Sequence, residues 1–208
     1  MKRVYFVRHG ETQGNVDRTD YGPQMELTEA GELQALQIAE RSKGIDFDVL
    51  ITSDLHRAKE TAEVIRSVKK CTVEVSPLFT EYTPPTILNG VRYDDPAFRT
   101  YVKERDENFD NSDWRFDDAE NIVELSARVE KARIFLESRE EEAIMVVTHS
   151  FFLRFFTASL LFGKSLTADA WAVIGRSLLT TNTGVTVYVY ENNTWKLLTW
   201  NDHAHFAE

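Results

Sequence analysis

The sequence contains a single cysteine, Cys71, so no disulfide can form within the chain and an oxidising compartment is not required. Positive charge is also scarce, because 24 lysines and arginines face 34 aspartates and glutamates, a net charge of −10. A general nucleic-acid-binding protein would carry a basic stripe, and an anionic membrane surface would also favour a basic protein. The composition therefore predicts neither partner. It still allows a small phosphorylated substrate held by a few local arginines and histidines.

No apolar run is typical of a membrane-spanning helix. The longest, residues 143–163, contains His149 and Arg154 and is better explained by a buried strand followed by a helix. The first residues carry two basic side chains and then only four apolar ones, too few for the hydrophobic region of a signal peptide. From these absences we expect a soluble cytoplasmic protein.

The composition and length predict one globular domain. Apolar residues make up 42% of the 208 residues and charged residues 28%, which excludes a disordered, collagen-like or low-complexity chain. A chain of this length buries a core large enough to fold without disulfides or metals. No linker or internal repeat divides it, so we expect residues 1–208 to form a single domain.

Three short apolar runs, residues 4–7, 49–51 and 144–147, show no alternation, which is typical of parallel strands buried on both faces. Helical spacing of apolar residues follows the second run and recurs over residues 122–136. Strands that alternate with helices predict an α/β fold, a three-layer αβα sandwich around a mostly parallel central sheet.

Two segments depart from that alternation. Residues 184–190 and 195–200 flank a polar turn, which predicts a C-terminal hairpin. Residues 80–118 are rich in charge and proline, with a short helical stretch near residues 97–109. We interpret this second segment as a cap inserted into the same domain.

Polar residues follow each buried run at the point where a strand would end. His9 follows the first run, Ser53 the second and His149 the third. Ligands of open α/β sheets bind just beyond the carboxyl ends of the strands, so we expect both histidines in one cleft. Ser53 would cap the helix that carries Arg57, and the start of that helix would favour an anion.

The segment Arg8-His9-Gly10-Glu11-Thr12 is suited to a phosphate group. An arginine can hold phosphate oxygens in a bidentate fork, and a glycine lets the backbone approach a ligand closely. The alternative is an ordinary loop histidine beside a surface arginine. The pentapeptide by itself leaves both interpretations open.

Three segments resemble, in order, the signature blocks of the histidine phosphatase superfamily, which has the phosphoglycerate mutase-like fold. They are RHGETQGN (8–15), SDLHRAKETA (53–62) and VTHSFFLR (147–154). Residues 182–206 are similar to the carboxyl end of the small phosphatases in that family. One RHG motif is a weak signal, but three blocks in the family's order, spanning nearly the whole chain, are specific.

The resemblance implies roles for these polar residues. His9 would be the nucleophile that becomes phosphohistidine, since an imidazole with one unprotonated nitrogen attacks phosphorus directly. Arg8, Arg57 and a cationic His149 would surround the phosphoryl group, and Asn15 would add an amide donor. Phosphoryl transfer needs positioning and positive charge, so these residues would act without a metal or cofactor.

Two further residues would extend the implied site. Ser150 stands where the family often has glycine. The backbone N–H donor survives that change, and the hydroxyl would add a hydrogen bond or narrow the pocket. Thr12 is a candidate minor phosphate ligand. His149 itself has an alternative interpretation, as a core histidine whose ring is satisfied by the backbone.

Glu81 resembles the general acid of the family. The leaving alkoxide must be protonated, which calls for a carboxyl with a raised pKa, and the same group would then activate water. The alternative is a solvated loop glutamate, in which case Asp94, Asp95 or Glu120 would supply the proton. Glu120 stands where the family often shows Gly-Glu-Ser, although its neighbours here differ.

His203 and His205 lie near the carboxyl end. Imidazoles suit zinc, copper or nickel, but two histidines without a third ligand are more typical of a surface, so we expect no metal site. His205-Phe206 resembles the family's ending, which predicts that the tail returns near the cleft.

The sequence therefore predicts a metal-independent phosphomonoesterase that acts on a small phosphorylated substrate through phosphohistidine on His9. A phosphoglycerate mutase would use the same site. However, the chain lacks the longer insertions and tail of mutases, and Tyr-Thr-Pro-Pro follows Glu81 where they have a Gly-Trp-Glu-Gly-like pattern. An inactive phospholigand-binding module would have lost the nucleophile or an arginine, and both are present. The substrate stays open, as does the oligomeric state, for which a homodimer is one option.

Overall fold

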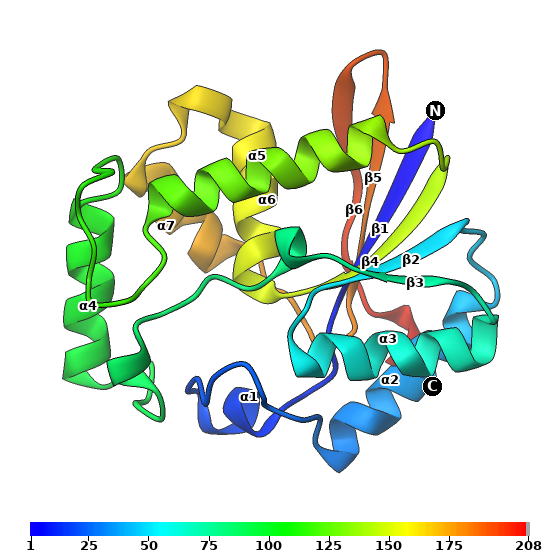
Figure 1. Ribbon diagram of the computed structural model, residues 1–208, viewed down its shortest axis with the longest axis horizontal. Coiled ribbons are helices and arrows are strands. Elements are labelled where there is room, and N and C mark those ends of the chain that lie inside the picture. Colours follow the sequence, from blue (N-terminus) through cyan, green and yellow to red (C-terminus); the bar gives the residue numbers. More distant parts are fainter. Residues whose placement is uncertain (207–208) are drawn as a thin grey trace.

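The computed structural model describes residues 1–206 and is built around one six-stranded sheet with the strand order β3-β2-β4-β1-β5-β6 (Figure 1). β3, β2, β4 and β1 run parallel, whereas β5 and β6 form an antiparallel hairpin whose first strand pairs with β1. The strands are β1 (Lys2–Arg8), β2 (Val49–Thr52), β3 (Val73–Val75), β4 (Ala143–Thr148), β5 (Val185–Glu191) and β6 (Thr194–Asp202). The mostly parallel sheet and the hairpin confirm the predicted fold class.

Helices cover both faces of the sheet, as a three-layer sandwich requires. α2 and α3 lie together on one face, while α5 and α6 lie on the other, with α7 packed against α6 (Figure 1). The helices are α1 (Gln13–Asp17), α2 (Glu29–Ser42), α3 (His56–Lys69), α4 (Pro96–Glu107), α5 (Ile122–Ser138), α6 (Ser150–Phe162) and α7 (Ala168–Ser177). Over residues 1–206, no helix combines the length and apolar character needed to cross a membrane.

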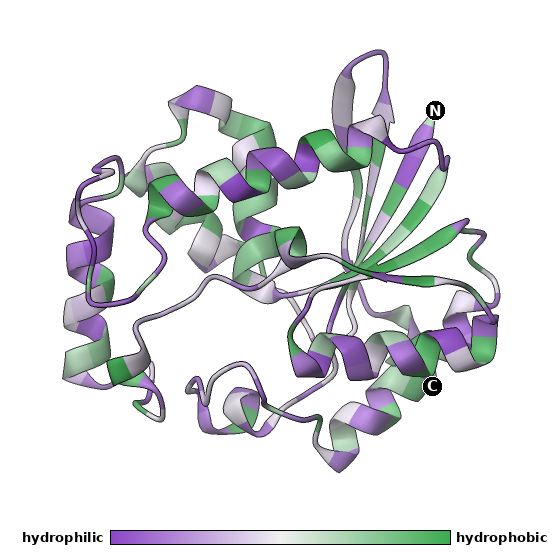
Figure 2. Ribbon diagram, in the orientation of Figure 1, coloured by the Kyte–Doolittle hydropathy of each residue, from purple (hydrophilic) through white to green (hydrophobic). Residues whose placement is uncertain are grey.

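Successive side chains of the central strands point to opposite faces of the sheet, so the protein has one apolar core on each face. In β1, Phe6 packs with α5 and α6 while Val7 packs with α2 and α3, and both side chains are fully buried. In β4, Val146 joins the first core and Val147 the second. Burial on both faces is why these strands are unbroken apolar runs in the sequence. Figure 2 shows hydrophobic residues concentrated on these strands and hydrophilic residues dominating α4.

Residues 80–118 extend beyond the carboxyl ends of β1, β2 and β4, and α4 is their main helix (Figure 1). Asp95 caps α4 by accepting a hydrogen bond from the N–H of Ala97 (2.8 Å), and Pro96 is the first helical residue. Tyr101 of α4 is fully buried in the same apolar cluster as α5 and α6. The segment is thereby packed on the α5–α6 side of the sheet.

α3 starts later than the sequence analysis expects. The helix begins at His56 with Leu55 at the N-cap, so Ser53 is not the cap of the helix that carries Arg57. The chain needs residues 53–55 to turn from the strand into the helix, and the hydroxyl of Ser53 accepts a hydrogen bond from the N–H of Leu55 in that turn (3.2 Å). The same hydroxyl lies 2.8 Å from Nε2 of His149, which places Ser53 at the functional site instead.

Candidate active site

His9 and His149 lie side by side at the carboxyl edge of the sheet. β1 pairs with β4 so that Arg8 is opposite Thr148, and each histidine is the next residue after its strand. The ring centroids are 5.0 Å apart, and the two residues are 3% and 0% exposed. The parallel pairing of two strands therefore places both histidines at one point, as the sequence pattern predicts.

The hydrogen bonds of His9 determine which nitrogen is free to react. Nδ1 lies 2.7 Å from the carbonyl oxygen of Gly10, which can only accept, so Nδ1 carries the proton. Nε2 is then unprotonated and accepts a hydrogen bond from Nε of Arg57 (3.2 Å). Burial, followed by the charges of Arg57 and Arg8, holds the pKa of His9 well below its usual 6.5. The ring is therefore neutral at physiological pH, with Nε2 unprotonated.

Arg57 and Arg8 bring unpaired positive charge to the same point. Arg57, in the first turn of α3, is 4% exposed, and its Nη1 is buried without a hydrogen-bond partner. Arg8 donates from Nη1 to the carbonyl of Thr180 (2.7 Å), but its Nε is also buried without a partner. Burial lowers the pKa of Arg8 to about 10, so its charge is retained at neutral pH. Buried donors without acceptors are costly, and an anion bound between them would satisfy both.

His149 differs from its expected charge state. Its Nδ1 is buried with no partner, while Nε2 faces the hydroxyl of Ser53. Burial, then the positive charge of Arg57 and the proximity of His9, hold the pKa of His149 well below 6.5. His149 is therefore neutral in the free protein and not the cation expected from the sequence. A further buried positive charge is costly beside arginines, and only the tertiary structure brings those arginines to the ring.

Asn15 faces the site with its amide. Its Oδ1 accepts hydrogen bonds from the backbone N–H of Thr12 (3.2 Å) and from Nδ2 of Asn182 (3.0 Å), which leaves its own NH₂ group available as a donor. Asn182 also donates to the carbonyl of His9 (3.0 Å). Thr12 supports Asn15 through its backbone, and its buried hydroxyl has no partner and does not line the cavity. Asn182 was missed by the sequence analysis, although its place just before β5, antiparallel to β1, puts it beside the end of β1.

Glu81 is held at the start of α6. Its carboxylate accepts hydrogen bonds from the N–H groups of Tyr82 (3.0 Å), Phe151 (3.0 Å) and Phe152 (2.8 Å), the last two being the free donors of the first turn of α6. Ser150, the first residue of that helix, hydrogen-bonds through Oγ to Oγ1 of Thr180 (2.6 Å). Both Glu81 and Ser150 line the cavity that contains His9.

The three alternative acids lie elsewhere. Asp94 is an exposed ion-pair partner of Arg92, and Asp95 caps α4. Glu120 binds the guanidinium of Arg128 through both carboxylate oxygens. Among residues 1–206 only Asp20 and Glu81 bring a carboxylate to the wall of the cavity.

The cavity has a volume of about 280 Å³ and is lined on its far side by the cap. Of the residues in the cap, Pro84 and Tyr93 line the cavity, whereas Pro85, Ile87, Leu88 and Arg92 do not. Tyr82 and Phe151 form a stacked pair in the wall, with ring centroids 4.6 Å apart. Two basic residues of the wall, Arg105 and Arg154, have no role predicted from the sequence.

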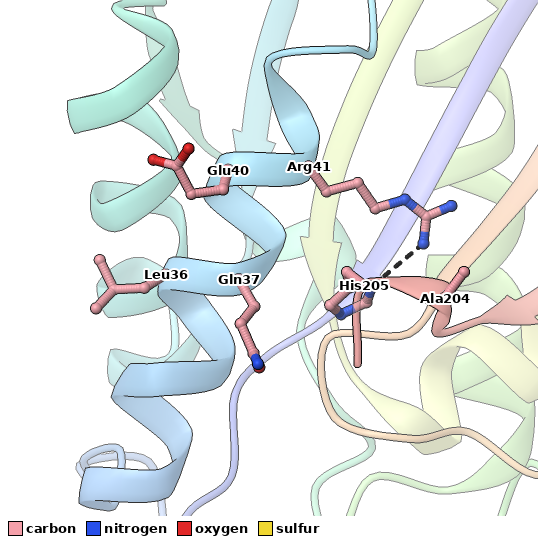
Figure 3. Close-up of a pocket in the computed structure, with 6 residues that line it drawn as sticks. All are labelled: Leu36, Gln37, Glu40, Arg41, Ala204 and His205. Carbon is pink, nitrogen blue, oxygen red and sulfur yellow. Dashed lines mark hydrogen bonds between the residues drawn. The ribbon is translucent and has the colours of Figure 1, made fainter. Parts of the chain in front are cut away.

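The carboxyl-terminal tail returns to the sheet but does not enter that cavity. His205 lies between Arg41, whose Nη1 is 3.1 Å from Nδ1, and Thr183, whose hydroxyl is 2.9 Å from Nε2. Figure 3 shows the contact of Arg41 with His205 beside a surface hollow between α2 and the tail. Thr183 in turn donates its N–H to the carbonyl of Arg8 (2.9 Å), so the tail supports the backbone of the site from behind. His203 is exposed, and residues 1–206 hold no cluster of three metal-ligating side chains.

Comparison with known proteins connects this geometry to a family. The profile of the histidine phosphatase superfamily (branch 1) matches residues 4–203. A protein of Escherichia fergusonii named "Probable phosphoglycerate mutase GpmB" is 30% identical over 206 residues, which cover 96% of this chain and 90% of that protein. Its counterpart in Salmonella arizonae is 29% identical with the same coverage.

Solved structures share the fold over almost their whole length. A mutant phosphoserine phosphatase from Entamoeba histolytica matches with a TM-score of 0.80 at 23% identity, covering 99% of this chain and 100% of its own. A mycobacterial glucosyl-3-phosphoglycerate phosphatase matches with a TM-score of 0.76 at 25% identity, covering 97% and 100%. Since the family profile covers nearly the entire sequence, this chain belongs to the histidine phosphatase superfamily and is an enzyme of the histidine phosphatase type.

Proposed function

We propose that this protein hydrolyses small phosphate monoesters through a phosphohistidine on His9, without a metal ion. The observation that carries the proposal is the state of His9, whose neutral Nε2 lies against Arg57 while Arg8 and Arg57 retain buried donors without acceptors. A phosphoryl group bound there would meet a nucleophile and two cations at once. The charge that builds on the equatorial oxygens would be stabilised by groups already in position.

The reaction follows from these positions. The substrate's oxygens take over the guanidinium of Arg57, which frees Nε2 of His9 to attack phosphorus as the bond to the leaving oxygen breaks. Glu81, protonated when the substrate is bound, donates its proton to that oxygen and is left as a carboxylate, while Asn15 and His149 complete the shell around the phosphoryl group. Water, deprotonated by Glu81, then attacks the phosphohistidine, which releases inorganic phosphate and restores His9.

The test is phosphate release from p-nitrophenyl phosphate in the presence of EDTA. We expect wild-type turnover in EDTA and a loss of about 10³-fold or more in His9→Ala, because the nucleophile and base act as a unit. The matched control is His56→Ala, a half-exposed histidine of α3 that contacts Glu60 (3.6 Å), and it should keep the wild-type rate. Wild-type turnover by His9→Ala would refute the mechanism. Acid-labile phosphoprotein after rapid quenching should be present only with His9.

A phosphoglycerate mutase is the second candidate, favoured by the names of the 29–30% identical relatives. Such an enzyme would return the phosphoryl group from His9 to bound substrate instead of to water. Interconversion of 2- and 3-phosphoglycerate, with and without a bisphosphoglycerate, separates the two. Interconversion that outpaces phosphate release would replace hydrolysis as the main activity, whereas phosphate release alone would support the hydrolase.

A further inference from the structure

The cavity holds more positive charge than one phosphoryl group uses. Arg8, Arg57 and Arg154 all line it, and none of the three forms an ion pair with any carboxylate of residues 1–206. The first two lie at His9, where a phosphoryl dianion would engage them. Arg154 is therefore a third cation in the wall, and burial lowers its pKa while Glu81 partly opposes that effect.

The contacts of Arg154 leave part of its guanidinium open. Nε donates to the carbonyl of Ser150 (3.3 Å), and Nη1 donates to the carbonyl of Gly175 in α7 (2.9 Å). Nη2 makes no hydrogen bond to residues 1–206 and is not sealed from solvent. The side chain is thus anchored by two carbonyls, so it presents a directed donor to the cavity at little further entropic cost.

Arg154 lies further along α6 than the histidine at the site. His149, at the N-cap, lies beside His9, whereas Arg154 is five residues further along the helix. A rise of 1.5 Å per residue separates the two backbone positions by about 7.5 Å along the axis. The side chain of Arg154 returns toward the first turn of α6, where Nε meets the carbonyl of Ser150. A second anionic group carried a few bonds away from the phosphate would meet the guanidinium in this part of the wall.

Arg105 strengthens the positive character of the same wall. It is 7% exposed, stacks over the rings of Tyr82 and Phe151, and lines the cavity, while its ion pair with Asp106 uses Nε and Nη2 only. The volume of about 280 Å³ lies at the lower end for small-molecule sites, which favours a compact ligand.

We propose that Arg154 forms a second anion subsite and that the preferred substrates are short phosphate monoesters whose alcohol portion bears another anionic group. The inference rests on the proposed hydrolase function and adds the substrate class to it. The shared chemistry is the second negative charge, which a carboxylate or a second phosphate would supply equally at an arginine fork.

Three esters on one carbon skeleton test this: 3-phosphoglycerate, glycerol 1,3-bisphosphate and glycerol 3-phosphate, whose alcohol portion is uncharged. We expect kcat/KM to be about 10- to 100-fold higher for one or both doubly anionic esters, the range of a charge-assisted hydrogen bond. The first two esters distinguish carboxylate from phosphate. Equal kcat/KM for all three esters would overturn the inference while leaving the hydrolase intact.

Substitution of Arg154 tests whether this residue causes the preference for doubly anionic esters. Arg154→Gln keeps a donor for the carbonyl of Gly175 but removes the charge, so the preference should fall to near unity, and Arg154→Lys should restore part of it. The matched control is Arg176→Gln, an exposed arginine of the neighbouring α7, which should keep the wild-type preference. A uniform loss on all three esters in Arg154→Gln would mean that Arg154 only supports the scaffold.

Calorimetric binding to His9→Ala separates the two proposals. If wild-type protein releases no phosphate from any ester, the hydrolase proposal fails by itself. The subsite is still supported if 3-phosphoglycerate or glycerol 1,3-bisphosphate binds to His9→Ala at least about tenfold more tightly than glycerol 3-phosphate and the difference disappears with Arg154→Gln. Equal binding of the three esters would refute it.

Discussion

At the scale of single residues, the site is held in a state that is costly without its ligand. Four buried polar atoms have no partner in residues 1–206: Nε of Arg8, the hydroxyl of Thr12, Nη1 of Arg57 and Nδ1 of His149. All four belong to residues that the sequence analysis singled out. Unpaired buried donors cost free energy, and a phosphoryl group bound at His9 would satisfy those of Arg8 and Arg57, whereas the hydroxyl of Thr12 does not line the cavity.

The two buried histidines predict how stability depends on pH. Above pH 6.5 they are neutral in both the folded and the unfolded chain, so their contribution is constant. Below 6.5 the unfolded chain gains protons that the buried rings of His9 and His149 cannot accept, because their folded-state pKa values are lowered. The free energy of unfolding should therefore fall by about 1.4 kcal/mol per pH unit for each histidine, until the pH reaches the folded-state pKa.

Urea unfolding at pH 7.5, 6.5 and 5.5 measures that slope. His9→Asn removes one of the two groups, so its loss of stability between pH 6.5 and 5.5 should be smaller than that of the wild type by about 1 kcal/mol, because an unfolded histidine is already half protonated at pH 6.5. Carboxylates contribute equally to both proteins and cancel in the difference. Identical slopes would show that His9 titrates normally in the folded protein.

At the scale of the elements, the loop after β1 depends on a close approach to α2. A Cβ on Gly31 of α2 would collide with the carbonyl oxygen of Glu11, and a Cβ on Gly10 would collide with the carbonyl of Gly31. These contacts are with backbone, which cannot rotate away as a side chain can. The packing of α2 therefore sets the path of the residues that follow His9.

We expect Gly31→Ala to lower the free energy of unfolding by about 1–3 kcal/mol, the range for overpacking, and to reduce kcat by moving the loop. Gly175→Ala is the matched control, since it lies within α7 and a Cβ there meets no atom within 4 Å. Alanine in that open helical position should stabilise the protein by up to about 1 kcal/mol. Thermal or urea unfolding compares the two variants with the wild type. A Gly31→Ala variant as stable as the wild type would contradict the close approach of α2 to the loop.

At the scale of the whole molecule, Arg128 joins three segments at the site. From α5 it binds the carboxylate of Glu120 through Nε (2.8 Å) and Nη2 (2.7 Å), just after the cap. It also donates to the carbonyls of Thr80 (2.6 Å) and Glu81 (3.3 Å). One guanidinium thus fixes the backbone of Glu81 against α5 and the end of the cap.

Arg128→Lys should lower kcat about 10- to 100-fold with a smaller change in KM, because a displacement of about 1 Å in a catalytic group has that effect. Arg133→Lys is its matched control on the same helix, where Arg133 pairs with Glu130 and Glu137 nearer the surface. Exposed pairs contribute little, so that variant should keep its kcat. An unchanged kcat in Arg128→Lys, measured on p-nitrophenyl phosphate, would exclude this positioning role.

The sequence predicted the order and nature of the central strands well because their evidence is local. Runs such as residues 4–7 and 144–147 are apolar throughout, which is the pattern expected of strands buried on both faces. The turn into α3 was less predictable. Ser53 is a good N-cap residue by type, yet the chain needed two more residues to complete the turn before the helix began at His56.

By itself, then, the sequence determined the family, the sheet and the placement of His9 and His149 at one edge, because motifs and apolar runs are written in consecutive residues. Only the tertiary structure decided which groups carry charge and which face the cavity. His149 is neutral because three separate segments bury it beside arginines, Glu120 pairs with Arg128 instead of reaching the cavity, and Arg154 joins the wall. Burial and pairing depend on segments far apart in the chain, and no local pattern records them.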